Sequence, residues 1–355
     1  MKLRIKDLNR FYKNKKILIT GHTGFKGSWL TMVLKFLGSS VHGFSLRDEN
    51  FKNLKSFGIQ KSIKNYYGDV SNLKEYEKVV KKIKPEIIFH LAAQSLVRKS
   101  YHDPFNTFLS NTVGVLNILE IKKRNNFVKS LVIVTSDKCY KNKESSVGYN
   151  ESSEIGGDDP YSGSKAAAEN ILHSYTVSFK KLFSSVSSVR AGNVIGGGDW
   201  SEDRIIPDIV RSILKNKKIF LRSPHAIRPW QHVLEPISGY VKLALFNYKF
   251  PNKFNSSWNF GPKTKKNLTV KMLVEKFLKY SKKKTSIIIQ KSNLKETKTL
   301  HLNSNKAKKK IKWESKWSHE NAIKETAEWY NAYFKKKNMY HFTLNQILKY
   351  FKNSI

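Results

Sequence analysis

Short apolar segments alternate with longer stretches of helical spacing through the first 190 residues of the chain. We predict strands at residues 17–20, 41–46, 66–68, 87–93, 131–136 and 185–190. Strands that alternate with helices in this way are joined by βαβ crossovers and build a parallel sheet. Residues 87–93 are apolar on both faces, which is typical of an interior strand of such a sheet. The pattern therefore predicts an α/β fold.

The regular alternation of strands and helices ends near residue 190. A glycine-rich stretch occupies 196–200, and apolar spacing predicts a helix over 204–214. We expect a doubly wound sheet domain of the Rossmann type, followed by a smaller C-terminal α/β lobe that binds substrate. The predicted boundaries are 14–190 with a return segment at about 231–258 for the sheet domain, 191–230 and 259–340 for the lobe, and 341–355 for a C-terminal tail.

Composition is that of a water-soluble globular protein, with 39% hydrophobic and 26% charged residues in 355. No apolar run reaches the roughly 18 residues that a membrane span requires, and the basic start is not followed by the apolar core of a signal peptide. The single cysteine, Cys139, has no partner in the chain for a disulfide. We therefore expect a cytoplasmic protein without a membrane partner.

The net charge of +39 raises the possibility of a nucleic-acid partner. Only 10 of the 66 basic residues are Arg, whereas base recognition relies on the forked donors of Arg. The Lys residues are spread along the chain in short runs, such as 282–284, 308–310 and 335–337. We interpret them as solvated surface and expect no specific nucleic-acid partner and no metal site.

A glycine-rich loop connects the first predicted strand to a helix. The loop reads GHTGFKG over residues 21–27, with a Gly-x-x-Gly-x-x-Gly spacing. Glycines allow a sharp turn and close approach of the backbone to a pyrophosphate, and free amides at the helix N-terminus attract its charge. The alternative is a glycine-rich turn without a ligand. The predicted cofactor contacts here are Gly21, Thr23, Gly24, Phe25, Lys26 and Gly27.

A tyrosine and a lysine lie four residues apart at Tyr161 and Lys165, near the start of an alanine-rich predicted helix. Four residues are about one helical turn, so the two side chains share a face. We expect the ammonium to lower the tyrosine pKa from its usual value of about 10, which would make the phenol a base for a hydroxyl group. Taken alone, the pair is also common on ordinary helix surfaces.

Several further stretches resemble the extended short-chain dehydrogenase/reductase superfamily, in its NAD-dependent sugar-nucleotide epimerase/dehydratase family. They are most similar to the family members that dehydrate CDP-glucose. The stretches are 20–30 (TGHTGFKGSWL), 90–98 (HLAAQSLVR), 135–140 (TSDKCY), 190–200 (RAGNVIGGGDW), 204–210 (RIIPDIV) and 225–236 (HAIRPWQHVLEP). The resemblance implies NAD as cofactor, CDP-glucose as substrate, and a homo-oligomer that is a dimer or a tetramer.

The resemblance also implies a reaction and its residues. The sugar is oxidised at C4, water is lost across C5 and C6, and the hydride returns to C6. Tyr161 takes the hydroxyl proton and Lys165 holds the phenolate and the cofactor. Ser136 hydrogen-bonds the C4 oxygen, and Asp137 donates a proton to the C6 oxygen. Lys138 stands where related dehydratases have their C5 base, and it either takes that proton or stabilises the enolate while another group does.

The remaining cofactor contacts implied by the resemblance are Asp48, Asp69, Val70, Leu91, Ala92, Ala93 and Asn111. Asp48 is expected to accept from the adenosine ribose, although Arg47 beside it leaves NADP open.

Substrate contacts are expected from Asn193, Arg204 and Arg228, the two arginines as candidates to hold the diphosphate. His232 is included, although packing is an equal alternative for it. Two other functions stay open, a 4-epimerase or a dehydratase for another nucleotide, and a noncatalytic NAD-binding protein. An epimerase needs only the Tyr-Lys pair, so Asp137 and Lys138 favour a dehydratase.

Overall fold

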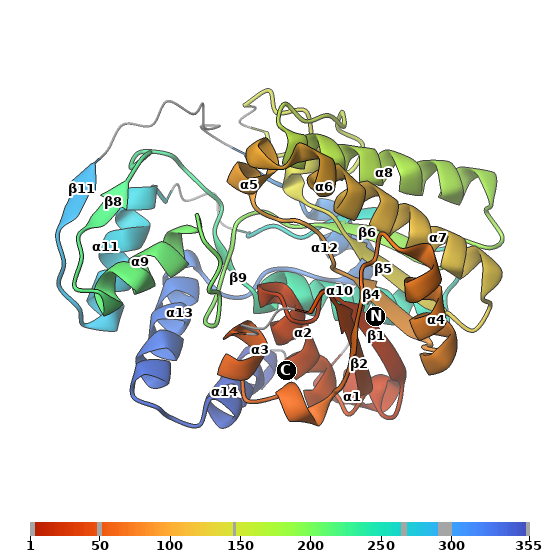
Figure 1. The fold of residues 1–355 in the computed structure, drawn as a ribbon, viewed down its shortest axis with the longest axis horizontal. Helices are drawn as coiled ribbons and strands as arrows, with labels where there is room; N and C mark the ends of the chain where they lie inside the picture. Colours follow the sequence, from red (N-terminus) through yellow and green to blue (C-terminus); the bar gives the residue numbers. More distant parts are fainter. Residues whose placement is uncertain (1–3, 48–51, 145–146, 264–267, 290–299, 353–355) are drawn as a thin grey trace.

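The computed structural model describes residues 4–47, 52–144, 147–263, 268–289 and 300–352. Within these residues the main element is a parallel sheet of seven strands, seen through the centre of Figure 1. Their order across the sheet is β10 (Ser257–Asn259), β6 (Val186–Arg190), β5 (Ser130–Val134), β4 (Ile87–His90), β1 (Lys16–Thr20), β2 (Ser40–Ser45) and β3 (Lys64–Tyr67). The direction of connection reverses between β1 and β4, where a doubly wound sheet opens a crevice for ligands.

Helices cover both faces of the sheet. One face carries α2 (Phe25–Phe36) and α10 (Leu234–Lys249), and the other carries α4 (Leu73–Ile83), α7 (Gly114–Arg124) and α8 (Pro160–Ser178). Strand side chains alternate between the two layers, so that neighbouring β1 residues belong to different apolar clusters. The predicted α/β fold of the Rossmann type is confirmed.

Two strands are shorter than predicted. The segment expected as 87–93 ends as a strand at His90, and the segment expected as 131–136 ends at Val134. Beyond His90, the Ala92 amide donates to the Thr20 hydroxyl oxygen at the end of β1 (3.1 Å) instead of to a backbone carbonyl. Apolar runs do not mark these ends because the residues that follow β5 are buried as well and those that follow β4 are half-buried. Both loops therefore lie at the carboxyl edge of the sheet.

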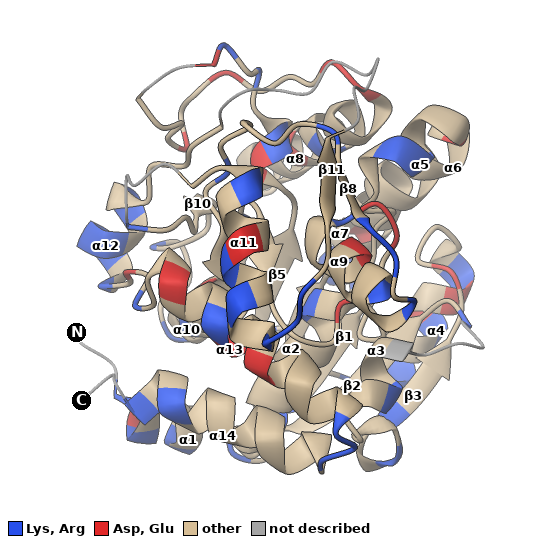
Figure 2. Cartoon of the chain, turned by 90° about the vertical axis from the view of Figure 1, so that its left-hand side faces the viewer, with Lys and Arg blue, Asp and Glu red and all other residues tan. Residues whose placement is uncertain are grey.

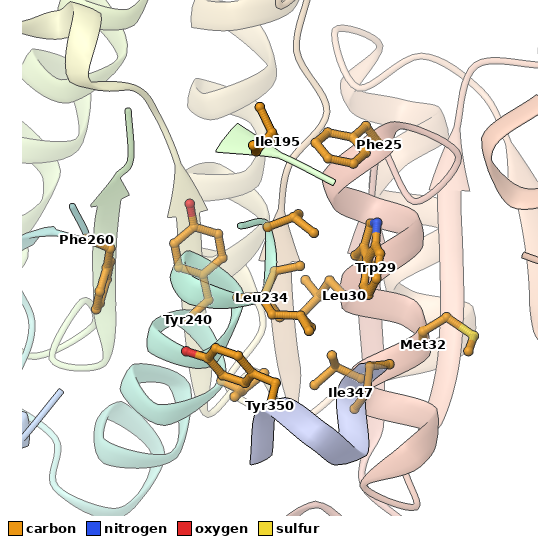
Figure 3. Packing of buried hydrophobic residues seen from close by; sticks show 14 of the residues in the cluster. Phe25, Trp29, Leu30, Met32, Ile195, Leu234, Tyr240, Phe260, Ile347 and Tyr350 are labelled. Atoms are coloured by element: carbon orange, nitrogen blue, oxygen red, sulfur yellow. The ribbon is translucent and has the colours of Figure 1, made fainter. Parts of the chain in front are cut away.

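The prediction of a C-terminal tail at 341–355 is wrong for the residues that the structure describes. Residues Met339–Lys352 form α14, whose Ile347 and Tyr350 are fully buried. Figure 3 shows both side chains pointing into the cluster that also holds Leu30 of α2 and Leu234 of α10. The apolar positions of α14 recur at helical spacing and cover α2 from outside. The helix is therefore part of the core.

A smaller group of elements stands beside the carboxyl edge of the sheet, on the left of Figure 1. It contains a parallel pair, β8 (Ile219–Leu221) with β11 (Ile287–Ile289), and a second pair, β7 (Val194–Ile195) with β9 (Gln231–His232). Its helices are α9 (Ile205–Leu214), α11 (Val270–Ser281) and α13 (His319–Phe334). The remaining helices are α1 (Ile5–Tyr12), α3 (Lys52–Ser56), α5 (Val97–His102), α6 (Pro104–Phe108) and α12 (Asn305–Ile311).

Charged residues are distributed over many surface elements. On the face shown in Figure 2, Lys and Arg occur on α5, α11 and α12, with Asp and Glu between them. None of the described helices is both long and apolar enough to cross a bilayer. Cys139 is buried with its thiol free.

Candidate active site

A cavity of about 920 Å³ runs along the carboxyl edge of the sheet and is bounded on its far side by α9 and β8. This volume is within the usual range for a small-molecule site, about 300–1,000 Å³. Of the site residues predicted from the sequence, Asp48 lies outside the described residues. All the others line the cavity except Asn111 and His232.

Asn111 and His232 are buried behind the cavity wall, where they contact other residues of the protein. Asn111 is buried, accepts from the Gln94 amide (2.8 Å) and donates to Ser164 of α8 (2.8 Å), so it ties a loop of the cavity wall to that helix. His232 is fully buried between Trp29 and Trp317, and its Nδ1 accepts from the Leu234 amide. Burial lowers the pKa of His232 to about 3. The prediction that His232 binds substrate is therefore corrected, because its ring packs in the core.

The glycine loop has the shape that a dinucleotide requires. Gly21 has a φ of +67°, and a Cβ on Gly27 would lie 2.1 Å from the Gly21 carbonyl oxygen. Side chains at these two positions would push the loop off the sheet. Gly24 is the N-cap of α2 and makes no side-chain cap, so the first amides of this helix are left for a ligand. These features fit the pyrophosphate of NAD.

Helix α8 positions the Tyr-Lys pair. Asp159 caps the helix by accepting from the Ser162 amide (2.9 Å), and Pro160 occupies its first position. The Tyr161 amide donates to the hydroxyl oxygen of Ser100 (3.1 Å), which anchors the first turn. Tyr161 and Lys165 are buried at 7% and 4% exposure and both line the cavity. Both side chains therefore lie in the cavity, where the sequence predicts them.

The predicted effect of Lys165 on the phenol is wrong. The pKa of Tyr161 is raised to about 12, mainly by burial, and the nearby Asp137 carboxylate acts in the same direction. A hydrogen bond with Ser136 and the charge of Arg204 act in the opposite direction. Burial also lowers the pKa of Lys165 to about 8, with a contribution from the Lys26 cation. The cation that favours the phenolate is therefore Arg204, from the other side of the cavity.

A short 3₁₀ turn follows β5 and presents Ser136, Asp137 and Lys138 to the cavity. The Ser136 hydroxyl donates to Asp137 Oδ1 (3.1 Å), and its oxygen accepts from the Lys138 amide (3.2 Å). Asp137 is 4% exposed, and burial raises its pKa, opposed by Lys138, Ser136 and Lys26. A carboxyl group with a raised pKa retains its proton more readily and suits a general acid.

Asp199 and Ser95 also belong to the site, and the motifs alone do not predict a role for either. The Arg204 guanidinium donates to Asp199 Oδ2 (3.1 Å) and to the Ser95 hydroxyl (2.8 Å). Asp199 and Ser95 therefore orient the side chain of Arg204, which is the N-cap residue of α9. Ser95 lies in the stretch 90–98 and Asp199 in the stretch 190–200, both of which resemble the sugar-nucleotide dehydratases. That resemblance is the signal in the sequence that points to them.

A buried ion pair lies behind the β5 end of the site. Arg190 donates to both carboxylate oxygens of Glu169, from Nε (2.9 Å) and from an Nη (2.6 Å), and each side chain is 3% exposed. Thr135 donates to Glu169 Oε1 and Ser188 to Oε2. This network connects α8, which carries Tyr161, to β6 and to the residues that directly follow β5, where Ser136 lies.

Comparison with known proteins gives the family. The sequence model for GDP-mannose 4,6 dehydratase matches residues 18–326. The chain belongs to the GDP-mannose 4,6 dehydratase family. This assignment confirms the predicted membership among the sugar-nucleotide dehydratases and epimerases. A relative, the CDP-glucose 4,6-dehydratase of Salmonella typhimurium, is 38% identical to this chain. The match covers 93% of this chain and 94% of the relative.

Solved structures show the same fold. The dTDP-glucose 4,6-dehydratase of Bacillus anthracis, in complex with NAD, superposes with a TM-score of 0.76 and 24% identity over 93% of this chain and 99% of its own. The UDP-glucose 4-epimerase of Thermotoga maritima, with UDP-glucose, gives a TM-score of 0.76 and 22% identity over 90% and 98%. The GDP-mannose 4,6 dehydratase family therefore shares this fold with epimerases, so the fold alone does not distinguish dehydration from epimerisation.

Proposed function

We propose that this protein is an NAD-dependent CDP-glucose 4,6-dehydratase, which converts CDP-glucose to CDP-4-keto-6-deoxyglucose and water. One observation carries the proposal: Asp137 and Lys138 line the same cavity as Tyr161 and Lys165. Tyr161 and Lys165 are proposed to serve the oxidation at C4, and Asp137 and Lys138 are proposed as the acid and the base that loss of water requires. The choice of CDP-glucose is supported by the Salmonella relative, to which this chain is similar over nearly its whole length.

The first step is oxidation at C4. When bound along the glycine loop, NAD would supply the hydride acceptor for C4 and the hydride donor for C6. Tyr161 receives the proton of the C4 hydroxyl. Because its pKa is about 12, the phenolate needs cationic neighbours, and Arg204 is the one that already lowers this pKa. Ser136 hydrogen-bonds Tyr161 and is proposed to hydrogen-bond the C4 oxygen as well.

The second step removes water. A ketone at C4 acidifies the C5 hydrogen, whose proton passes to a base while its electron pair forms the C5–C6 double bond. The C6–O bond breaks, and Asp137 gives its proton to the departing oxygen, which leaves as water. Lys138 lies next to Asp137 in the 3₁₀ turn and is the proposed C5 base. It returns this proton to C5 when the hydride is delivered to C6. Arg204 and Arg228 line the cavity and are proposed to bind the diphosphate, with Asn193 close to the sugar.

We also propose that the protein forms a homo-oligomer through α6, α7 and α8. Apolar side chains are exposed along this layer, among them Phe105 (74%), Val177 (51%), Leu182 (46%) and Leu116 (37%). A surface of this kind favours a second copy of the chain. Sedimentation equilibrium distinguishes a dimer or tetramer from a monomer, and a monomer at micromolar concentration contradicts this part.

The test of the reaction uses purified protein loaded with NAD and a panel of CDP-, dTDP-, UDP- and GDP-glucose. We expect a 4-keto-6-deoxy sugar from CDP-glucose, detected by its absorbance in base and by mass spectrometry as a loss of water. Tyr161→Phe is expected to lower turnover by about 100-fold or more, because it removes the base at C4. Formation of CDP-galactose instead of a dehydrated product identifies an epimerase and overturns the proposal.

A further inference from the structure

The two proposed catalytic pairs come from separate elements of the fold. Tyr161 and Lys165 lie near the start of α8, whereas Asp137 and Lys138 lie in the 3₁₀ turn that follows β5. Both pairs act on one bound hexose, so the distance between the helix and the turn has to match the sugar. A misplacement of about 1 Å between reacting groups can cost about 100-fold in rate. Contacts that fix α8 relative to the turn therefore bear on the reaction.

The 3₁₀ turn is supported at both of its ends. At the first end, the Thr135 amide donates to the Val189 carbonyl (3.0 Å) and extends the pairing of β5 with β6. The second end is Tyr140, whose amide donates to the Asp137 carbonyl (3.3 Å) and closes the turn. A short antiparallel bridge also pairs Tyr140 with Ile155. The residues between the two ends therefore depend on Tyr140 as well as on β5 for their position.

The side chain of Tyr140 contacts the protein interior and does not line the cavity. It is 1% exposed, and its hydroxyl oxygen accepts from Arg190 Nη1 (2.6 Å) while the hydroxyl donates to Asn259 Oδ1 (2.8 Å). Burial raises the pKa of Tyr140, so the phenol keeps the proton that it donates. The ring also stacks on Tyr149, with 5.4 Å between the ring centres. Tyr140 is therefore fixed to β6 through Arg190 and to β10 through Asn259.

Arg190 connects Tyr140 to the helix that carries the other catalytic pair. Its Nε (2.9 Å) and its Nη2 (2.6 Å) donate to the Glu169 carboxylate. Glu169 lies about one helical turn after Lys165 on α8. Arginine can hold two partners in this way because its donors point in fixed and different directions. One guanidinium therefore binds α8 and the end of the 3₁₀ turn at the same time.

We propose, on the basis of the dehydratase function above, that Tyr140 is a positioning residue for loss of water. Through Arg190 and Glu169, it holds the 3₁₀ turn at a fixed distance from α8. Ser136 directly follows the anchored Thr135 and keeps its place without this contact, whereas the acid and the base that follow Ser136 lose one of their supports. Tyr140 therefore acts on the loss of water more than on oxidation at C4.

The alternative is that Tyr140 is an ordinary core residue that stabilises the fold. Loss of its hydroxyl would then lower the free energy of unfolding and leave the ratio of the two reaction rates unchanged. A positioning role predicts a change in this ratio in a folded protein. The two explanations are therefore separated by measuring each chemical step by itself.

The experiment compares wild type with Tyr140→Phe, which removes the hydroxyl and keeps the ring. The matched control is Tyr149→Phe, because the hydroxyl of this stacked ring contacts Asn142 (2.9 Å) and the Lys143 amide (2.7 Å), both outside the turn. A second test variant is Arg190→Lys, which keeps the charge but replaces the fork of donors by one ammonium. Circular dichroism and NAD titration check that each variant is folded and binds its cofactor.

A single turnover with CDP-glucose separates the two steps. Reduction of bound NAD, followed at 340 nm, reports oxidation at C4, and mass spectrometry of quenched samples reports loss of water. We expect Tyr140→Phe to slow loss of water by about 10- to 100-fold and to change oxidation by about threefold or less, so that reduced NAD accumulates before product. Arg190→Lys should show the same pattern, and Tyr149→Phe should match wild type in both steps.

Equal slowing of both steps in Tyr140→Phe, or an unchanged rate of water loss, overturns the role of Tyr140 and leaves the dehydratase function intact. If one of the two test variants does not fold, the same criteria apply to the other. Failure of wild type itself to release water from any nucleotide sugar overturns the proposed function instead.

Discussion

Replacement of Glu169 by Gln tests whether the ion pair behind the active site stabilises the fold. The carboxylate accepts from Arg190 at both oxygens and from Thr135, Ser188 and Ser257. Despite its burial, the pKa of Glu169 is lowered, with Arg190 as the main cause of the lowering. The Gln side chain has one amide group in place of an oxygen, so at least two of these donors lose their acceptor. The guanidinium of Arg190 then stays buried without a counter-charge.

Removing one partner of a buried ion pair costs about 3–5 kcal/mol, because the other charge is left without compensation. We expect a loss of this size in the free energy of unfolding of Glu169→Gln. The matched control is Glu154→Gln, whose carboxylate is 50% exposed and pairs with Lys141 and Lys143 on the surface. Solvent-exposed pairs contribute about 0–1 kcal/mol, so the control should be close to wild type.

Urea unfolding followed by circular dichroism gives the free energy of unfolding of both variants. The dependence of this free energy on urea concentration should equal that of wild type, which shows that the unfolding transition is unchanged. The double variant Glu169→Gln/Arg190→Met removes the stranded charge as well, and it should be more stable than Glu169→Gln alone. A Glu169→Gln protein within about 1 kcal/mol of wild type, or a double variant that is less stable still, refutes the reasoning from charge burial.

Two further predictions follow from single side chains. Gly27→Ala would place a Cβ 2.1 Å from the Gly21 carbonyl oxygen. NAD titration should therefore show lost binding, and normal binding by this variant contradicts the fit of the loop. Burial raises the pKa of Glu235 to about 7 from an ordinary value near 4.5, so the native state holds this proton more tightly than the unfolded state. The contribution of Glu235 to the free energy of unfolding is complete below about pH 4.5 and falls by on the order of 3 kcal/mol as the pH rises past 7. In Glu235→Gln, urea unfolding at several pH values should show a smaller dependence of this free energy on pH.

Local patterns were enough to predict the sheet and the position of the site. The glycine loop and the Tyr161 helix each follow from a few neighbouring residues, and the topology of a parallel sheet brings their ends together. The strand at 131–136 was placed well enough to put Ser136 and Asp137 in the cavity, although it ends two residues earlier.

Properties that depend on tertiary surroundings were not predictable in this way. The pKa of Tyr161 depends on burial and on Arg204, which lies on a different element, so the four-residue spacing to Lys165 gave the wrong direction. His232 is polar in the sequence and packs between two tryptophans in the fold.

The position of α14 bears on how the protein is made in the cell. This helix covers the outer side of α2, which forms near the opposite end of the chain. During translation α2 leaves the ribosome long before α14 exists, so its apolar side stays in contact with water or with a chaperone until synthesis has reached the last helix. Premature termination before residue 339 should therefore yield an insoluble fragment, although every residue of the catalytic cavity has already been synthesised.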